Sequence, residues 1–294
     1  MHYVITGSIG HTGKPITEGL VKAGHTVTVV TSSPAKAATI EALGAKAAVG
    51  SVDDGAFLKE AFAGADAVYL LIPSRFDVSD WRAYQNKVAD NYIDAIQAND
   101  IRFAVLLSSI GADLGKGTGP VDGLYDVEHK LGKVEGLNTK ILRPSYFMYN
   151  LFSMIDLAKN MGIMGANFGG DPIVLTHTDD IANVALGELL NLDFTGQQVR
   201  YIASDERTGS EIARVLGGAI GKPEIPWVVF SDEQTAAGMQ QAGMSEETAL
   251  AYATMGETIR SGKMQADFFR NKPVYGKVKL EDFAKNEFAP AFGV

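Results

Sequence analysis

Three glycines near the start of the chain have the spacing of a phosphate-binding loop. Gly7, Gly10 and Gly13 form a G-x-x-G-x-x-G pattern directly after a β-branched run and directly before a helix expected to begin near Lys14. Glycine lets the backbone turn sharply and approach a pyrophosphate, whose charge the free amides of a helix N-terminus then hold. The pattern therefore predicts a dinucleotide site rather than a purely structural turn. The other candidate cofactor-binding residues of the loop are Ile9, His11 and Thr12, for which the alternative is simple exposure of His11 and Thr12 to solvent.

The residues after the second predicted strand decide which dinucleotide fits. An Asp or Glu there normally binds the ribose hydroxyls of NAD, but the run that follows Thr31 contains no acid. Ser32 and Ser33 can donate hydrogen bonds to a 2′-phosphate, and Lys36 can supply charge. We therefore predict a preference for NADP(H) over NAD(H). The alternative is that both serines cap the helix after Pro34.

The elements that position these residues alternate along the first half of the chain. A β-branched run, a turn with Gly or Ser and a helical stretch repeat in the manner of βαβ units. The predicted strands cover residues 3–6, 26–31, 45–49, 67–72, 103–108 and 139–142. Their continuous apolar character suits parallel strands buried on both faces. The predicted fold class is α/β, a doubly wound parallel sheet of Rossmann type with a smaller, mainly helical C-terminal domain.

The second half is less regular. The glycine-rich segment 161–170 is predicted to be a loop, and Asp179 and Asp180 are expected to complement the dipole of a helix capped by Thr178. A helix over 210–216 is expected to end at Gly217 and Gly218. The predicted domains are a dinucleotide-binding domain over 1–150, against which 172–204 packs, and a substrate-side domain over 205–294.

Composition excludes several classes of function. The 294 residues include no cysteine, which excludes disulfides, zinc–thiolate sites and cysteine nucleophiles. A net charge of −9, from 26 Lys and Arg against 35 Asp and Glu, argues against a nucleic-acid partner. No apolar run approaches the roughly 18 residues of a membrane-spanning helix, so we expect a cytoplasmic protein without a membrane partner. The five histidines never have i, i+4 spacing, so we expect no metal. The sequence leaves the oligomeric state open, a homodimer included.

Six segments carry a resemblance to a known family. They are TGSIGHTGKPI, GSVDD before a helix, VYLLIPS, VLLSSIG, ILRPSYFMYNL and THTDDIA. Together they resemble the NmrA-like branch of atypical short-chain dehydrogenases, and within it the NAD(P)H-dependent quinone oxidoreductase type, from Met1 to about Leu190. The resemblance implies a Rossmann domain and a small C-terminal domain over a cleft. It also places Asp53, from GSVDD, among the cofactor-binding residues.

The usual proton donor of short-chain dehydrogenases is missing at its expected place. These enzymes place Tyr-x-x-x-Lys on the helix after the fifth strand, where lysine lowers the pKa of the phenol. Here His129 stands four residues after Tyr125, and Lys130 follows it. These three residues are the candidate catalytic group, and an exposed helix with ordinary polar residues is the alternative. The true Tyr-x-x-x-Lys, from Tyr275 to Lys279, lies far from the nucleotide half and is discarded.

The resemblance implies further site residues and two departures. An acidic residue of this helix matches Glu128, and the Arg-Pro step with following aromatics matches Arg143, Pro144, Tyr146 and Phe147. Glu128, Tyr146 and Phe147 are the candidate substrate residues. Ser32 stands where many relatives carry an arginine, which weakens the predicted NADP preference, and Ile9 replaces a frequent threonine.

The ends of three predicted strands supply the remaining cofactor contacts. In open parallel sheets, ligands bind beyond the carboxyl ends of the strands. The residues at those ends, expected along the cofactor toward its nicotinamide, are Ile72, Pro73, Ser108, Ser109, Pro144 and Ser145.

These features predict an NAD(P)H-dependent oxidoreductase that transfers a hydride to a quinone-like or other planar small molecule. A quinone suits a site without the tyrosine pair, because water or one weak acid can quench the oxyanion that hydride transfer produces. The alternative is a non-catalytic redox sensor that binds NADP and signals through a protein partner. A sugar-nucleotide epimerase is disfavoured because the tyrosine pair is missing.

Overall fold

The computed structural model describes residues 1–75, 78 and 80–294, which form two compact units. The first unit contains residues 1–109, 123–143 and 181–200, and the second contains 110–122, 144–180 and 201–294. The units therefore interleave along the chain, whereas the predicted domains are mostly sequential. Residues 144–150 belong to the second unit, although the dinucleotide-binding domain was expected to include them.

Within the described residues, seven strands form one sheet. They are β1 (His2–Ile5), β2 (Thr26–Thr31), β3 (Lys46–Val49), β4 (Ala67–Leu71), β5 (Phe103–Leu107), β6 (Asn138–Pro144) and β10 (Gln197–Ile202). Their order is β10-β6-β5-β4-β1-β2-β3, and β1 to β6 are parallel to their neighbours. The chain winds outward from β1 to β3 and then crosses to β4 on the other side of β1. This order confirms the predicted doubly wound sheet and places its switch point at β1.

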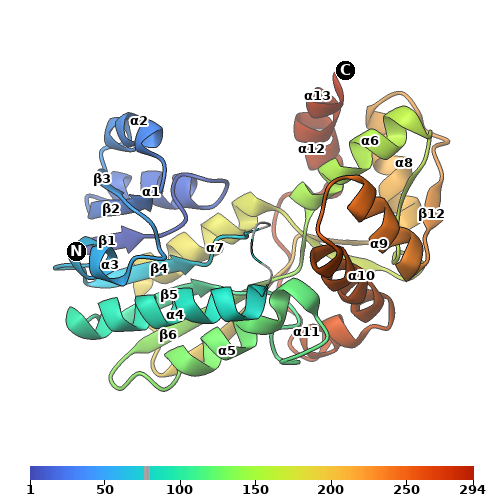
Figure 1. Ribbon diagram of the computed structural model, residues 1–294. Coiled ribbons are helices and arrows are strands. Elements are labelled where there is room, and N and C mark those ends of the chain that lie inside the picture. Colours follow the sequence, from blue (N-terminus) through green and yellow to red (C-terminus); the bar gives the residue numbers. More distant parts are fainter. Residues whose placement is uncertain (76–77, 79) are drawn as a thin grey trace. The chain divides into compact units, whose positions relative to one another are not determined.

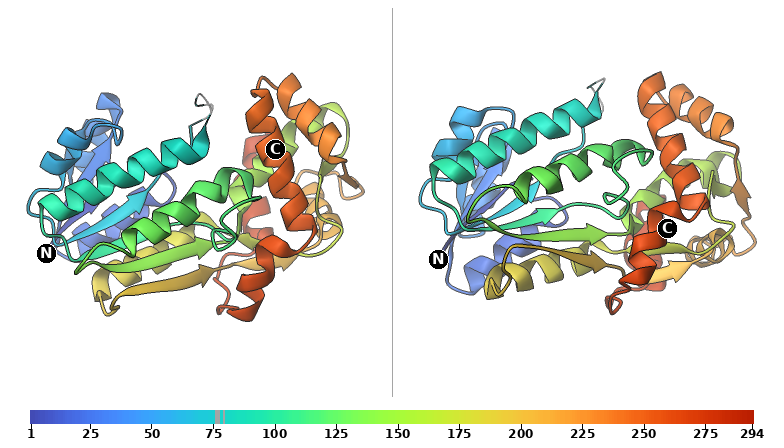
Figure 2. Two further views of the ribbon diagram at one scale, coloured as in Figure 1. Left: turned by 60° about the horizontal axis from the view of Figure 1, so that its bottom comes forward. Right: turned by 90° about the horizontal axis from the view of Figure 1, so that it is seen from below.

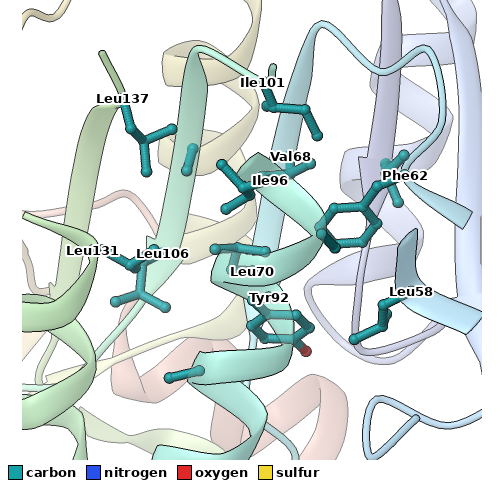
Figure 3. Close-up of a cluster of buried hydrophobic side chains, with 14 of the residues drawn as sticks. Leu58, Phe62, Val68, Leu70, Tyr92, Ile96, Ile101, Leu106, Leu131 and Leu137 are labelled. Carbon is teal, nitrogen blue, oxygen red and sulfur yellow. The ribbon is translucent and has the colours of Figure 1, made fainter. Parts of the chain in front are cut away.

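Helices cover both faces of this sheet (Figure 1). They are α1 (Gly13–Lys22), α2 (Ala37–Ala42), α3 (Gly55–Ala61), α4 (Trp81–Ala98), α5 (Asp122–Leu131) and α7 (Thr178–Asn191). The teal α4 and the green α5 run side by side in all the views of Figures 1 and 2. With α3 they bury one apolar core against the strands, in which Phe62 stacks on Tyr92 with ring centroids 6.2 Å apart (Figure 3). On α1, a Cβ added to Gly19 would lie 2.3 Å from Leu186 of α7, so these two helices pack closely as well.

The second unit is mainly helical, as predicted for the C-terminal region. Its helices are α6 (Met154–Asn160), α8 (Gly209–Ala219), α9 (Asp232–Gln241), α10 (Glu246–Arg260), α11 (Ala266–Arg270), α12 (Leu280–Phe283) and α13 (Ala289–Phe292). Its strands are β7 (Tyr146–Phe147), β8 (Met164–Ala166), β9 (Ile173–Thr176), β11 (Asp205–Arg207) and β12 (Trp227–Val229). Among the described helices of the whole chain, none is both long and apolar enough to cross a membrane.

Two predictions for this region are wrong. The segment 161–170 is not all loop, because β8 lies within it and pairs in parallel with β12. Gly217 and Gly218 do not end α8, which continues to Ala219. A Cβ on Gly217 would lie 2.4 Å from the carbonyl oxygen of Lys222, so this glycine allows the chain to fold back closely against the helix.

Candidate functional site

The three glycines between β1 and α1 meet three different requirements. Gly7 has φ +86°, a left-handed conformation that favours glycine. A Cβ on Gly13 would lie 2.0 Å from the carbonyl oxygen of Ser8, so only glycine lets α1 begin this close to the loop. A Cβ on Gly10 would meet nothing nearer than the Gly7 carbonyl oxygen at 3.8 Å, and Gly10 is exposed. The fold requires Gly7 and Gly13, whereas the open side of Gly10 fits the close approach of a pyrophosphate.

The N-terminus of α1 can bind an anion. Its first turn contains no acidic residue, and the Thr12 side chain does not cap it. The positive end of the helix dipole is therefore not neutralised by a carboxylate of its own helix. Thr12 is only 6% exposed, and its Oγ1 accepts a hydrogen bond from the Tyr69 hydroxyl at 3.3 Å. The alternative in which Thr12 is simply exposed is wrong, whereas His11 is indeed exposed.

The turn after β2 presents polar groups without an acid. Ser32 and Lys36 are exposed, and Ser33 precedes the short 3-10 turn Pro34–Lys36. The Ser33 side chain makes no capping hydrogen bond, so the capping alternative is not observed for this serine. Across the described residues, neither serine hydroxyl has a hydrogen-bond partner within the chain. Both hydroxyls are therefore available to a ligand.

Asp53 lies in the turn between β3 and α3 and is already ion-paired. Its carboxylate lies 3.3 Å from Nη1 of Arg75 and 3.7 Å from Nζ of Lys87, and it accepts a hydrogen bond from the Ser51 hydroxyl. The Asp53 side chain is 27% exposed. These cations offset the charge that Asp53 would otherwise present to an anionic ligand. Its predicted contact with the cofactor stays a prediction.

The ends of β4 and β5 meet at the same edge of the sheet as the glycine loop. Leu71 pairs with Leu107, and β4 also pairs with β1. The candidate residues that follow these strands are therefore neighbours at this edge, namely Ile72 and Pro73 after β4 and Ser108 and Ser109 after β5. Ile72, Pro73 and Ser109 are half-buried, and Ser108 is buried.

A buried ionic network joins α5 to β5 and β6. Glu128 is 4% exposed and Arg143 is 7% exposed. Nε and Nη2 of Arg143 donate to the two carboxylate oxygens of Glu128 at 3.1 and 2.6 Å, and the Ser108 hydroxyl donates to Oε1 at 2.5 Å. Such a two-point pair satisfies both charges in the interior. In this structure the Glu128 carboxylate is buried against Arg143 and Ser108, and its predicted contact with a substrate stays a prediction. Spacing along the chain could not show the contact with Arg143.

The candidate catalytic residues of α5 separate into two groups. Tyr125 and His129 share a helical face, with ring centroids 3.9 Å apart, and His129 Nδ1 lies 2.8 Å from the Tyr125 carbonyl oxygen. Lys130 points elsewhere, because its Nζ binds Asp90 of α4 at 2.7 Å. A catalytic role for Lys130 stays a prediction. A proton-donating role for Tyr125 or His129 stays a prediction.

The second unit holds the other candidate residues. Ser145, next to Pro144, is 3% exposed, and its amide donates to Thr176 Oγ1 at 3.0 Å. Its hydroxyl is buried without a hydrogen-bond partner among the described residues. Tyr146 packs edge to face against Phe168, and burial raises the pKa of Tyr146. Phe147 is half-buried beside it on β7.

Tyr275 and Lys279 do not form a proton-transfer pair. The Tyr275 hydroxyl donates to Glu206 at 2.7 Å, and burial together with this carboxylate raises the pKa of Tyr275 to about 12. A tyrosine acid requires the opposite shift. Lys279 donates to the carbonyl oxygens of Ser204 and Gly276 instead. These contacts give a physical reason for discarding the motif.

Asp180 is an anchor within the second unit rather than only a dipole complement. It is 6% exposed and accepts hydrogen bonds from the Ser204 hydroxyl and from the amides of Lys277 and Val278. Helix α7 begins at Thr178 itself, so the expected capping position is off by one residue. Asp180 therefore fixes the segment before α12.

The first half of the chain is similar to known nucleotide-binding proteins. Residues 7–150 match a family described as NAD(P)H-binding. The NAD(P)H azoreductase of Xenophilus azovorans is 24% identical over 252 residues, which are 84% of this chain and 83% of that protein. A (4-alkanoyl-5-oxo-2,5-dihydrofuran-3-yl)methyl phosphate reductase of Streptomyces griseus is 23% identical over 220 residues, which are 75% of this chain and 74% of that protein.

Solved structures share the fold over nearly the whole chain. The NADPH-dependent quinone oxidoreductase QOR2 of Escherichia coli, complexed with NADPH, aligns with a TM-score of 0.79 and 22% identity over 97% of this chain and 99% of that one. The triphenylmethane reductase of Citrobacter sp. aligns with a TM-score of 0.80 and 16% identity over 99% of this chain and 100% of that one. The predicted Rossmann fold is confirmed by these alignments.

Proposed function

We propose that this chain, whose residues 7–150 are an NAD(P)H-binding domain, is an oxidoreductase that transfers a hydride to a planar small-molecule acceptor of the quinone or azo type. The observation that carries the proposal is the glycine loop, where Gly10 leaves open the space in which a pyrophosphate fits, beside a helix N-terminus without an acid. The relatives named as reductases, which align over three quarters of the chain or more, support the chemistry.

The turn after β2 favours NADP(H) within this proposal. An acid there would repel a 2′-phosphate by about 1 to 4 kcal/mol, depending on screening, and none is present between Thr31 and Lys36. The unpartnered hydroxyls of Ser32 and Ser33 and the exposed ammonium of Lys36 can bind that phosphate. Serines and one lysine make a weaker clamp than an arginine fork, so the preference should be modest.

The roles of the chain's residues follow from this reaction. When bound, the nicotinamide supplies the hydride. The loop from Gly7 to Gly13 binds the pyrophosphate, and Tyr146 and Phe147 are the proposed acceptor contacts. Tyr125, whose ring lies beside that of His129, is the proposed proton donor, although a quinone needs little proton chemistry from the protein. The protein then acts mainly by positioning the acceptor ring.

Steady-state turnover tests the proposal. Oxidation of NADPH and NADH should be followed by absorbance at about 340 nm, with a quinone, an azo dye, a triphenylmethane dye and a simple carbonyl as acceptors. We expect turnover with at least one planar acceptor and a higher kcat/KM with NADPH. Tight NADP⁺ binding without turnover of any acceptor would instead support the sensor function.

A matched substitution tests the cofactor preference. Ser32→Asp places a carboxylate beside the ribose position and should reverse the order of the two cofactors, because the carboxylate repels a 2′-phosphate and accepts from ribose hydroxyls. Ser32→Asn, which is similar in shape but neutral, is the control and should keep the original order. Tighter NAD(H) binding by the unmodified protein would contradict the proposed preference.

A further inference from the structure

Ser8 has an unusual backbone conformation inside the glycine loop. Its φ of +62° lies in the left-handed region, which disfavours residues with a side chain. The other described non-glycine residues with positive φ are Asp100 and Leu192, which follow the ends of α4 and α7. Left-handed residues are common at such helix ends, but Ser8 has no helix end to explain it. Glycine would adopt this conformation without the same cost, so we expect an interaction of the serine side chain that offsets the strain.

That interaction is a hydrogen bond to β2. The Ser8 hydroxyl donates to Oγ1 of Thr31 at 2.9 Å, and the Ser8 amide donates to the carbonyl oxygen of Val30 at 3.0 Å. Thr31 is 2% exposed and is the last residue of β2. The loop is therefore tied to the end of the neighbouring strand through a buried hydroxyl.

The same Thr31 hydroxyl also fixes the following turn. Its Oγ1 accepts a second hydrogen bond, from the amide of Ser33, at 3.2 Å. Both lone pairs of Oγ1 are then used, one by the glycine loop and one by the turn that contains Ser32 and Ser33. The carbonyl oxygen of Thr31 accepts from the amide of Gly50, which ties the turn to the end of β3 as well.

We propose that the Ser8–Thr31 hydroxyl pair is a specificity-determining device for the dinucleotide. It sets the turn of Ser32 and Ser33 at a fixed distance from the pyrophosphate loop, so that the 2′ position of the adenosine ribose meets those two serines. NADP(H) and NAD(H) differ only at that 2′ position, and a turn free to shift would contact either cofactor less selectively. This inference rests on the proposed function. Ser8 and Thr31 act through Ser32 and Ser33 and are positioning residues.

Calorimetric binding of NADP⁺ and NAD⁺ to the full chain tests this inference without relying on turnover. We expect the unmodified protein to bind NADP⁺ more tightly than NAD⁺. Ser8→Ala should reduce the ratio of the dissociation constant of NAD⁺ to that of NADP⁺ by about fivefold, which is the effect of one net hydrogen bond. Thr31→Val should reduce it at least as much, because this change also removes the acceptor of the Ser33 amide. Adding Ser8→Ala to Thr31→Val should have little further effect, since both remove the same bond. Thr31→Ser keeps the hydroxyl and should keep the ratio.

Thr28→Val is the matched control. Thr28 lies on the same strand, is 4% exposed, and has a hydroxyl bonded to the His2 ring rather than to the loop. Its replacement should leave the ratio unchanged whatever it does to the melting temperature. If Ser8→Ala left the ratio unchanged, or weakened the binding of both cofactors equally, the inference would be overturned while the proposed function stayed intact. Should Thr31→Val fail to fold, Ser8→Ala decides the matter alone. An unmodified protein that binds both cofactors equally would also overturn the inference, and one that binds neither would overturn the proposed function with it.

Discussion

At the scale of single residues, Gly10 separates cofactor binding from folding. Its Cβ position is open, whereas a side chain at Gly13 would collide with backbone at 2.0 Å. Gly10→Val should therefore fold with an unchanged melting temperature but fill the space that the pyrophosphate needs. We expect the calorimetric Kd for NADP⁺ to rise at least about 100-fold, equivalent to ~2.7 kcal/mol.

A second valine variant controls for the substitution itself. Gly187 on α7 belongs to the same unit, and an added Cβ there meets no atom within 4 Å, so Gly187→Val makes the same chemical change away from the loop. It should bind NADP⁺ like the unmodified protein. If Gly10→Val held NADP⁺ as tightly as Gly187→Val, the pyrophosphate would not lie at this loop.

Some single-residue features of the site could be predicted from the sequence, and others could not. The phosphate loop was predictable because its three glycines have a spacing that physical chemistry explains locally. The pair of Glu128 and Arg143 was not, since it forms only when α5 packs on β6 and 15 residues separate its members. The left-handed φ of Ser8 could not be predicted, because nothing in the sequence around this one serine indicates it.

At the scale of elements, the buried Glu128–Arg143 pair fixes α5 against the sheet. Glu128→Ala would remove both carboxylate acceptors of the buried Arg143 guanidinium, and breaking a buried ion pair typically costs about 3 to 5 kcal/mol. The free energy of unfolding in urea should fall by that amount. Lys130→Ala, on the same helix, removes a partly exposed pair with Asp90 and should cost no more than about 1 kcal/mol. Similar losses in the two variants would mean that the buried pair does not hold α5.

The contact between α4 and α5 should depend on pH. The Arg82 guanidinium, which donates to both carboxylate oxygens of Asp126, lowers the pKa of Asp126 to about 2. A folded-state pKa below the ordinary value of 3.8 stabilises the fold above about pH 4, and this stabilisation is lost as the pH falls through about 2.

Asp126→Asn removes that titrating group. The urea midpoint of the variant should therefore fall less steeply than that of the unmodified protein between about pH 4 and pH 2, with a small difference because the pair is partly exposed. Asp94→Asn is a suitable control, since Asp94 is 60% exposed in its pair with Lys59. Parallel acid profiles for Asp126→Asn and the unmodified protein would contradict the assignment.

The elements themselves were predictable where hydropathy patterns are strong. The six predicted strands of the first half are all present. Five of them lie inside the sheet, where continuous apolar runs are buried on both faces, whereas β3 is an edge strand and only partly buried. Strand β8 escaped prediction because its sequence, Met-Gly-Ala, has no β-branched residue and depends on pairing with β12. Helix α8 continues through two glycines, and the absence of a side chain at Gly217 allows the backbone of Lys222 to pack closely against it.

At the scale of the whole molecule, the two compact units draw on interleaved stretches of chain. Residues 110–122 leave the first unit for the second and return, and 181–200 do the reverse. The sequence analysis expected residues 172–204 to pack against the first domain, but no composition shift marks the passage of residues 110–122 into the second unit.

If the protein acts mainly by positioning the acceptor, substitutions at the acceptor contacts should lower kcat/KM more than loss of a proton donor does. Tyr125→Phe removes one proton donor and should cost less than the factor of about 10² to 10⁴ typical of a general acid or base. Tyr146→Ala or Phe147→Ala removes an acceptor contact and should lower kcat/KM more, because a misplaced ring loses the near-attack geometry. Tyr149→Ala, an aromatic truncation three residues from Tyr146 at a side chain 45% exposed, is the control and should stay active.

The measurement is steady-state NADPH oxidation with one simple quinone for all four variants, with melting temperatures to confirm folding. Positioning predicts that Tyr125→Phe and Tyr149→Ala stay close to the unmodified protein while the other two fall. A loss of activity in Tyr125→Phe beside active alanine variants would replace positioning with proton relay, and the neighbouring His129 would then be the next residue in that relay.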